Sequence, residues 1–120
     1  EPTLADDAIS GSPYYLSPET FAGRPSDPRS DLYSLGMTLF EMLAGRLPEM
    51  GTNLAQLSEF KRGGRLPSVR GFAPQVPSEV SGYVRHLIAN QPVRRPQHAK
   101  DVVQSLMRLE IATLSERVPG

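Results

Sequence analysis

Residues 30–48 read SDLYSLGMTLFEMLAGRLP, and this stretch predicts a central, buried helix. Its apolar residues recur at i, i+3, i+4, i+7, i+8 and i+11, which places them on one helical face. That face holds Leu32, Leu35, Gly36, Leu39, Phe40 and Leu43, and Met37, Met42 and Ala44 add apolar surface elsewhere. A helix that is apolar nearly all round is expected to be covered by other elements. Gly45 predicts its C-terminal cap, and Pro48 follows at the usual distance.

Three further helices are predicted after this one. A short helix with a thin apolar stripe covers 53–62 and ends at Gly63-Gly64. Ser78 offers a side-chain oxygen to cap the next helix, and the stretch NQPVRRP at 90–96 ends it. The last helix covers 98–114, with Ala99, Val102, Val103, Leu106 and Leu109 on its inner side. Since no stretch predicts a strand convincingly, the fold class is mainly α.

Residues 1–30 contain five prolines and little periodicity, and they predict a long loop with one helical turn at 19–22. A compact domain seldom carries so long a loop without a functional reason. This segment is therefore the first candidate for function.

Composition excludes several classes of function. The 13 basic and 13 acidic side chains cancel, so no nucleic acid or anionic membrane surface is an expected partner. There is no Cys and no apolar run long enough to span a membrane, which fits a cytoplasmic location. His86 and His98 lie on different predicted helices without carboxylates at ligand spacing, so no metal site is expected.

Three stretches in order resemble the C-terminal lobe of the protein kinase fold, from the activation segment to the last helix. GSPYYLSPE at 11–19 resembles the family's Gly-Thr-x-x-Tyr-x-Ala-Pro-Glu sequence, and NQPVRRP resembles its Asp-Pro-x-x-Arg-Pro turn. The stretch at 30–48 resembles the helix between them, with Asp31, Gly36, Glu41, Gly45 and Pro48 in register. The Tyr in DLYSLG resembles the bacterial Ser/Thr kinases in particular.

The chain departs from the family at four places. Ser12 stands where Thr is usual, and Ser17 replaces the Ala of Ala-Pro-Glu. Asn90-Gln91 occupy the place of an acidic residue, and Glu49 stands where Phe usually follows Pro48. The changes at 90–91 and at Glu49 bear on details of local packing and leave the resemblance in fold intact.

The resemblance implies that residues 1–120 are part of a protein kinase domain. Residues 1–29 would be the activation segment and the substrate-receiving loop, 30–114 the helices of the C-terminal lobe, and 115–120 a tail. Ser12, Pro13, Tyr15 and Glu41 would then contact a protein substrate, although Glu41 equally fits a solvated or structurally paired carboxylate. Thr3 and Ser10 fall where activation segments are phosphorylated.

The same resemblance implies supporting roles for four residues. Glu19 and Arg95 would form a buried ion pair, in which a guanidinium binds a carboxylate with two hydrogen bonds. Asp31 would accept backbone N–H groups of the catalytic loop, although a first-turn carboxylate is also favoured by the helix dipole alone. Gly36 would support the central helix.

Phosphoryl transfer needs groups that bind the phosphates and Mg²⁺ and orient the hydroxyl, and the chain lacks the motifs that supply them. No Gly-rich loop, Val-Ala-x-Lys, His-Arg-Asp or Asp-Phe-Gly occurs, so no residue is a catalytic candidate. We therefore expect a fragment that is inactive alone and binds no cofactor, whose complete parent domain uses ATP and Mg²⁺.

The expected partners are a protein substrate and the missing N-terminal part of the kinase domain. Apolar surface that this part should cover could also promote self-association. Two alternatives are a pseudokinase or scaffold that uses the helices only for docking, and an unrelated helical binding domain.

Overall fold

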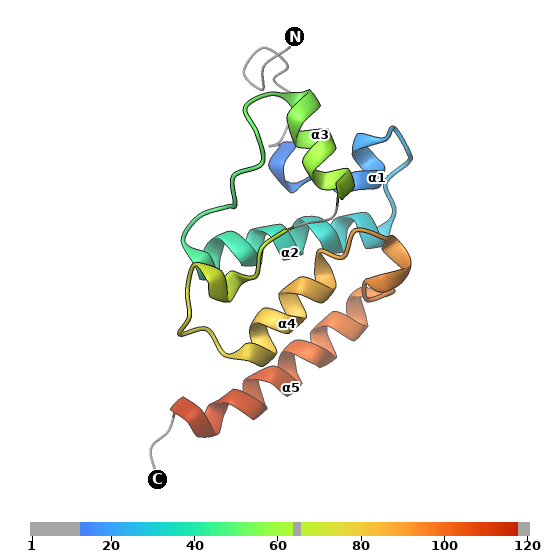
Figure 1. Cartoon of the computed structure of the whole chain (residues 1–120). Helices are drawn as coiled ribbons and strands as arrows, with labels where there is room; N and C mark the ends of the chain where they lie inside the picture. The colour runs from blue at the N-terminus through green and yellow to red at the C-terminus, as the bar shows by residue number, and fades with distance from the viewer. Residues whose placement is uncertain (1–12, 64–65, 118–120) are drawn as a thin grey trace.

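The computed structural model describes residues 13–63 and 66–117, with side chains up to residue 110. Within these residues every regular element is a helix, which confirms the mainly α fold class (Figure 1). Thr3, Ser10 and Ser12 lie outside the described residues. The predictions made for them, and the division at residues 29 and 114, stay predictions.

Five α-helices and three short 3-10 turns follow one another along the described chain. The helices are α1 (Pro18–Phe21), α2 (Pro28–Ala44), α3 (Leu54–Gly63), α4 (Ser78–Leu87) and α5 (Ala99–Arg117). The turns are η1 (Pro13–Tyr15), η2 (Val69–Gly71) and η3 (Pro92–Arg94). In Figure 1, α1 and α3 lie on one side of α2, and α4 and α5 lie on the other.

The central helix α2 begins earlier than the periodicity predicted. Asp27 is its N-cap, and its carboxylate accepts hydrogen bonds from the backbone N–H groups of Arg29 and Ser30. The Ser30 hydroxyl oxygen in turn accepts a hydrogen bond from the Asp27 backbone N–H, which completes a capping box, and Pro28 occupies the first turn. Gly45 ends the helix in the left-handed conformation at φ 84°, as predicted.

The buried face of α2 is rotated from the predicted one. Tyr33 and Met37 are buried, whereas Leu35 is exposed at 37%. The closest packing occurs at Gly36, where an added Cβ would lie 2.6 Å from Ile88 and 2.7 Å from Leu87 of α4. The backbones of α2 and α4 therefore approach closely because position 36 has no side chain.

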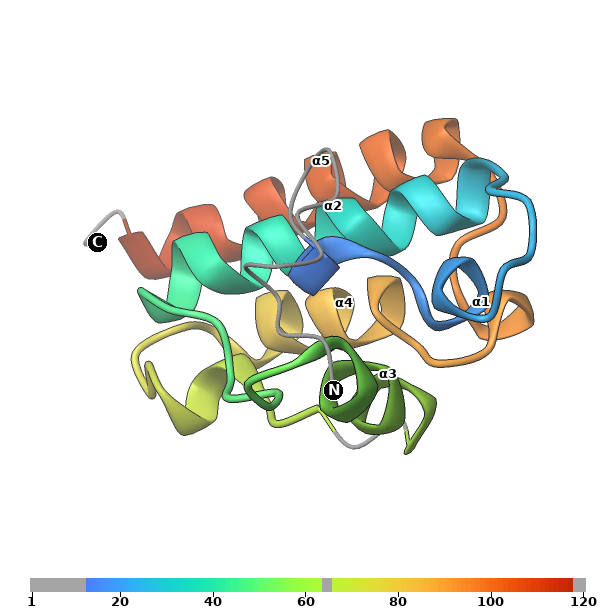
Figure 2. The same ribbon diagram turned by 90° about the horizontal axis from the view of Figure 1, so that it is seen from above.

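The core has two parts. The larger part joins α2, α3, α4 and the loops between them, and includes Phe40, Met50, Leu57, Val69 and Val84. The smaller part joins α2, α4 and α5 through Leu32, Leu87 and Val102. Figure 2, viewed from above, shows α5 running beside α2.

Two details of the later helices correct the sequence-based predictions. The predicted cap at Ser78 is wrong: Pro77 is the N-cap of α4, no side chain caps it, and Ser78 is the first helical residue. The inner face predicted for the last helix is also wrong in part. Val102 is buried, but Val103 and Leu106 are exposed at 56% and 41%, because α5 contacts its neighbours along a narrow line.

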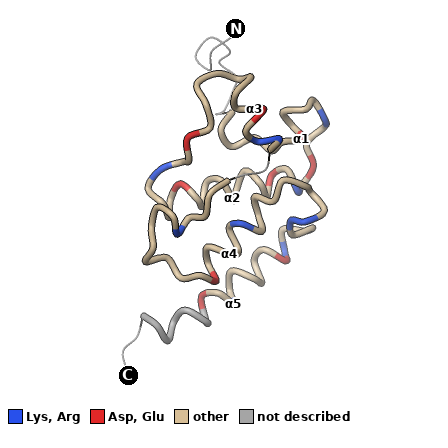
Figure 3. Tube along the Cα trace, in the orientation of Figure 1, with Lys and Arg blue, Asp and Glu red and all other residues tan. Residues whose placement is uncertain are grey.

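Acidic and basic positions are both spread along the described trace (Figure 3). No helix among the described residues is long and apolar enough to cross a lipid bilayer.

Candidate substrate-binding site

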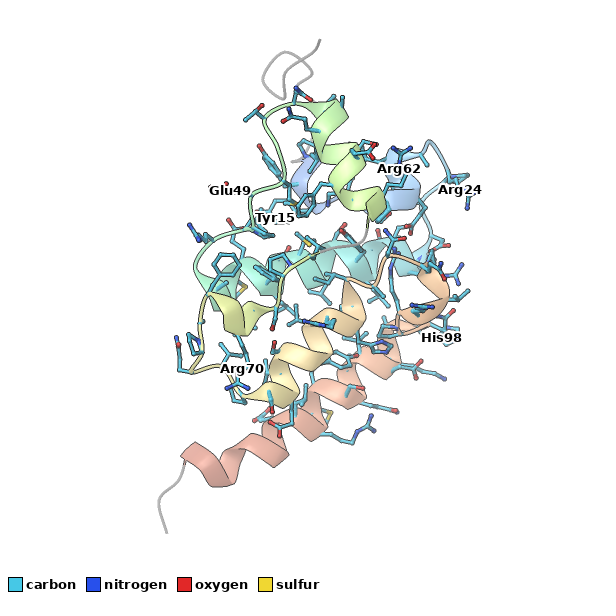
Figure 4. All side chains as sticks on the ribbon, viewed as in Figure 1. Tyr15, Arg24, Glu49, Arg62, Arg70 and His98 are labelled. Carbon is cyan, nitrogen blue, oxygen red and sulfur yellow. The ribbon has the colours of Figure 1, made fainter. Side chains whose placement is uncertain are left out.

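The η1 turn lies against α2 and is bonded to it at two points. The Ser34 hydroxyl donates to the backbone carbonyl of Tyr15 over 2.8 Å, and the Tyr15 hydroxyl donates to the carboxylate of Glu41. That hydrogen bond, together with burial and the Glu41 charge, raises the pKa of Tyr15. Figure 4 labels Tyr15 in the region between α2 and α3. The structure thus brings together three predicted substrate-binding residues, Pro13, Tyr15 and Glu41.

Glu19 and Arg95, which are 76 positions apart, form a bidentate ion pair. The Arg95 Nη1 and Nη2 atoms lie 2.6 and 2.8 Å from the two carboxylate oxygens of Glu19. Both side chains are buried, at 0% and 9% exposure. Burial alone would raise the pKa of Glu19, but hydrogen bonds from Arg95, from its own backbone and from Ser30 lower it to about 2.

Every N–H of the Arg95 guanidinium has an acceptor. Besides Glu19, the group donates to the carbonyls of Ala89, Asn90 and Arg29 at 2.8, 3.0 and 3.0 Å. A guanidinium carries five N–H donors, and all are used here. A buried charge is stable only when it is paired and fully hydrogen-bonded. Arg95 therefore joins α1, the start of α2 and the segment after α4.

The start of α1 depends on Ser17, which is buried. Its hydroxyl accepts the Thr20 backbone N–H and caps the helix. Glu19 in the first turn also accepts a 2.9 Å hydrogen bond from the Ser30 hydroxyl. Serine at position 17 thus adds a capping oxygen that alanine could not provide.

Lys61 is a site residue to which the sequence motifs assign no role, although it falls at the end of the helix predicted at 53–62. Its side chain is 1% exposed, and Nζ donates to the backbone carbonyl of Tyr14 over 2.5 Å. The same nitrogen lies 4.8 Å from the centre of the Tyr33 ring. Burial lowers the pKa of Lys61 to about 7. A charged residue at a helix end gives no local signal that it will be buried.

Two adjoining shallow hollows lie near α3, and the first of them borders the η1 turn. The first, of about 470 Å³, is lined by Tyr14, Leu47, Pro48 and Glu49 among others. The second, of about 530 Å³, is lined by residues of α3 and shares Met50 and Gly51 with the first. In Figure 4, Glu49 lies on the segment that joins α2 to α3. The turn and the two hollows are therefore continuous through Tyr14, Met50 and Gly51.

Asp31 and Gly36 lie away from that surface. Asp31 is in the first turn of α2 and is exposed. Gly36 is at the contact of α2 with α4. His86 and His98 remain apart, on α4 and before α5, and the described residues hold no cluster of His, Cys, Asp or Glu suited to a metal ion.

Comparison with known proteins gives the same family as the three sequence motifs. The family described as protein kinase domain matches residues 3–109.

The chain belongs to the protein kinase domain family.

Bacterial Ser/Thr kinases are among the curated relatives. The serine/threonine-protein kinase PrkC of Bacillus subtilis is 34% identical over 79% of this chain, and 15% of PrkC is covered. PknB of Mycolicibacterium smegmatis is 36% identical over 85% of the chain, with 16% of PknB covered. The kinase pkn2 of Myxococcus xanthus is 36% identical over 93%, with 14% of it covered. The chain thus spans about one seventh of the length of these relatives.

Family membership makes Mg²⁺ relevant, and the described residues offer it no ligand cluster. No set of three acidic or metal-ligating side chains converges among them. Of the two lysines, Lys61 is buried under the η1 turn and Lys100 is exposed on α5.

Proposed function

We propose that this chain is the substrate-binding and regulatory part of a Ser/Thr protein kinase domain, which transfers the γ-phosphoryl group of ATP to a protein serine or threonine. The observation that carries the proposal is the η1 turn, which is bonded to α2 through Tyr15, Ser34 and Glu41 and borders the first of two adjoining open hollows. A rigid turn next to an open surface suits the binding of an extended peptide.

The Glu19–Arg95 pair supports the same function. It lies just after the turn in sequence and joins α1 to the start of α2 and to the segment before α5. Catalytic geometry tolerates little displacement, since a shift of about 1 Å can cost about 100-fold in rate. The pair restrains the chain immediately after the substrate-receiving loop, so the loop keeps its place when a substrate binds.

The two parts of the kinase domain have different roles in this proposal. This chain contributes the peptide surface, and ATP and Mg²⁺ bind residues of the N-terminal part of the domain. Ser12, placed by resemblance in the loop, would favour serine and threonine acceptors. Phosphate on Thr3 or Ser10 would order the activation segment by pairing with arginine.

The test is a phosphotransfer assay on the full-length protein with MgATP and degenerate peptides that carry Ser, Thr or Tyr as the single acceptor. We expect transfer to Ser and Thr peptides and not to Tyr peptides. We also expect the S12A variant to lose most activity while S26A, an exposed serine beyond α1, keeps it. A folded full-length protein that transfers no phosphate to any peptide would instead identify a scaffold.

A further inference from the structure

We propose that Lys61 is a positioning residue for the substrate-receiving loop, because its side-chain nitrogen donates to the Tyr14 carbonyl and sets the η1 turn (Pro13–Tyr15) against α3. The inference deepens the proposed function and rests on it, since it takes the η1 turn as a contact of the protein substrate.

The polar partner of the Lys61 ammonium group is a backbone carbonyl of the η1 turn. The side chain is buried, and among the described residues no carboxylate lies within ion-pair distance of Nζ. Its polar contact is the Tyr14 carbonyl, and the face of the Tyr33 ring provides a second favourable contact. A buried amine is costly unless it is hydrogen-bonded, so the position of the Tyr14 carbonyl is strongly coupled to that of Nζ.

The backbone of Lys61 is itself held by hydrogen bonds, so the contact of its side chain with Tyr14 can hold the η1 turn in place. The Asn90 side chain donates to the Lys61 carbonyl over 2.6 Å, and Arg95 donates to the Asn90 carbonyl over 3.0 Å. The end of α3 is therefore joined to the Glu19–Arg95 pair. The η1 turn is bonded from two directions: from α2 through Ser34 and Glu41, and from α3 through Lys61.

The charged and titratable groups around Lys61 come from several elements. Tyr14 lies on η1 and Tyr33 on α2, and the Arg95 guanidinium lies 5.0 Å from the Tyr33 ring centre and is paired with Glu19 of α1. On α3 itself, exposed Glu59 pairs with Arg62.

Of the groups around this contact, Lys61 is the one expected to change its protonation state near neutral pH. The pKa of Glu19 is lowered to about 2, and burial raises the pKa of Tyr33. Burial lowers the pKa of Lys61 to about 7, so its ammonium form is present below that pH and the neutral amine above it. The hydrogen bond to Tyr14 is stronger from the ammonium form, so the turn is fixed more firmly below pH 7.

The test uses the complete kinase domain and compares Lys61→Met with Lys100→Met. Methionine keeps the unbranched stem and removes the charge, and Lys100 is the exposed lysine of α5. With the best peptide of a degenerate Ser/Thr library at pH 6, where the Lys61 side chain is an ammonium group, we expect Lys61→Met to raise the peptide KM about tenfold, the effect of losing one charged hydrogen bond. The KM for ATP should be unchanged, and Lys100→Met should match the wild type.

The pH profile separates positioning from a purely structural role. The wild-type peptide KM should rise between pH 6 and pH 8 as Lys61 loses its proton, and the Lys61→Met profile should be flat over that range. A Lys61→Met peptide KM within twofold of the wild-type value at pH 6, or a Lys61→Met pH profile like that of the wild type, would overturn the inference even if the melting temperature falls.

Hydrogen exchange gives a readout that does not depend on activity. The Leu16 N–H donates to the Pro13 carbonyl across the turn, so its exchange reports on the turn. We expect Lys61→Met to accelerate exchange at Tyr15 and Leu16 and to leave α5 unchanged. Faster exchange in a protein that transfers no phosphate would refute the proposed function alone. Unchanged exchange in an active kinase would refute the role of Lys61 alone.

Discussion

Arg95 donates two hydrogen bonds of 2.6 and 2.8 Å to the carboxylate of Glu19. The remaining N–H groups of the guanidinium donate to three backbone carbonyls. The pair joins segments that are 76 positions apart. Its removal should therefore affect the whole fold and not one helix.

Replacing Arg95 by Met should strongly destabilise the domain. The variant leaves a buried carboxylate without its partner, which costs about 3–5 kcal/mol in the free energy of unfolding. Chemical denaturation of the complete domain measures the loss. The neighbouring Arg94→Met is the matched control, because Arg94 is exposed, and it should change stability by less than about 0.5 kcal/mol. Equal losses in the two variants would contradict a structural role for the pair.

The pair should also make stability depend on pH in the acid range. Because the pKa of Glu19 falls from 4.5 to about 2 on folding, the unfolded chain binds the proton first. The contribution is therefore fully present above pH 4.5 and is lost as the pH falls towards 2. Between pH 4.5 and pH 2, the free energy of unfolding from denaturation curves should fall less steeply for Glu19→Gln than for the wild type. The same slope in both proteins would mean that another carboxylate is responsible.

Gly36→Ala should destabilise the contact between α2 and α4. The added methyl group would lie 2.6 Å from Ile88 and 2.7 Å from Leu87, so the helices must separate. Overpacking of this kind costs about 1–3 kcal/mol.

Gly82→Ala is the matched control for that variant. Gly82 lies inside α4, and a Cβ there would meet no atom within 4 Å. Alanine should stabilise the helix at this position by about 0.5–1 kcal/mol. Thermal unfolding of the two variants should shift the midpoint in opposite directions, and a lower midpoint for both would contradict the packing argument.

The isolated chain should self-associate through apolar side chains that other parts of the domain are expected to cover. Met42 of α2 and Met107 of α5 are exposed at 73% and 60%, and further exposed apolar side chains on these helices are Leu35, Val103 and Leu106. Sedimentation should show oligomers of the wild-type chain and less association for Met42→Lys combined with Met107→Lys. Val93→Lys, at a residue exposed at 71% on η3, is the control and should not dissociate the oligomers. A monomeric wild-type chain would refute this prediction.

The errors of the sequence-based predictions have local and non-local causes. The start of α2 could have been predicted, because the sequence before the apolar repeat contains a recognisable N-cap pattern. It consists of Asp27, Pro28 and Ser30. Leu35 could not have been assigned correctly, since Tyr33 and Met37 compete with it for the buried face. Which of them is buried depends on where α4 lies.

The sequence by itself determined the helical segments, the glycine that ends α2 and, through three ordered motifs, the family. These features depend on neighbouring residues and on spacing along the chain. Only the tertiary structure decided that Lys61 is buried beneath Tyr14 and that Ser34, Glu41 and Lys61 restrain one turn from two helices. The physical reason is that burial and hydrogen-bond partners arise from elements far apart in sequence, whose positions are set by the packing of the core.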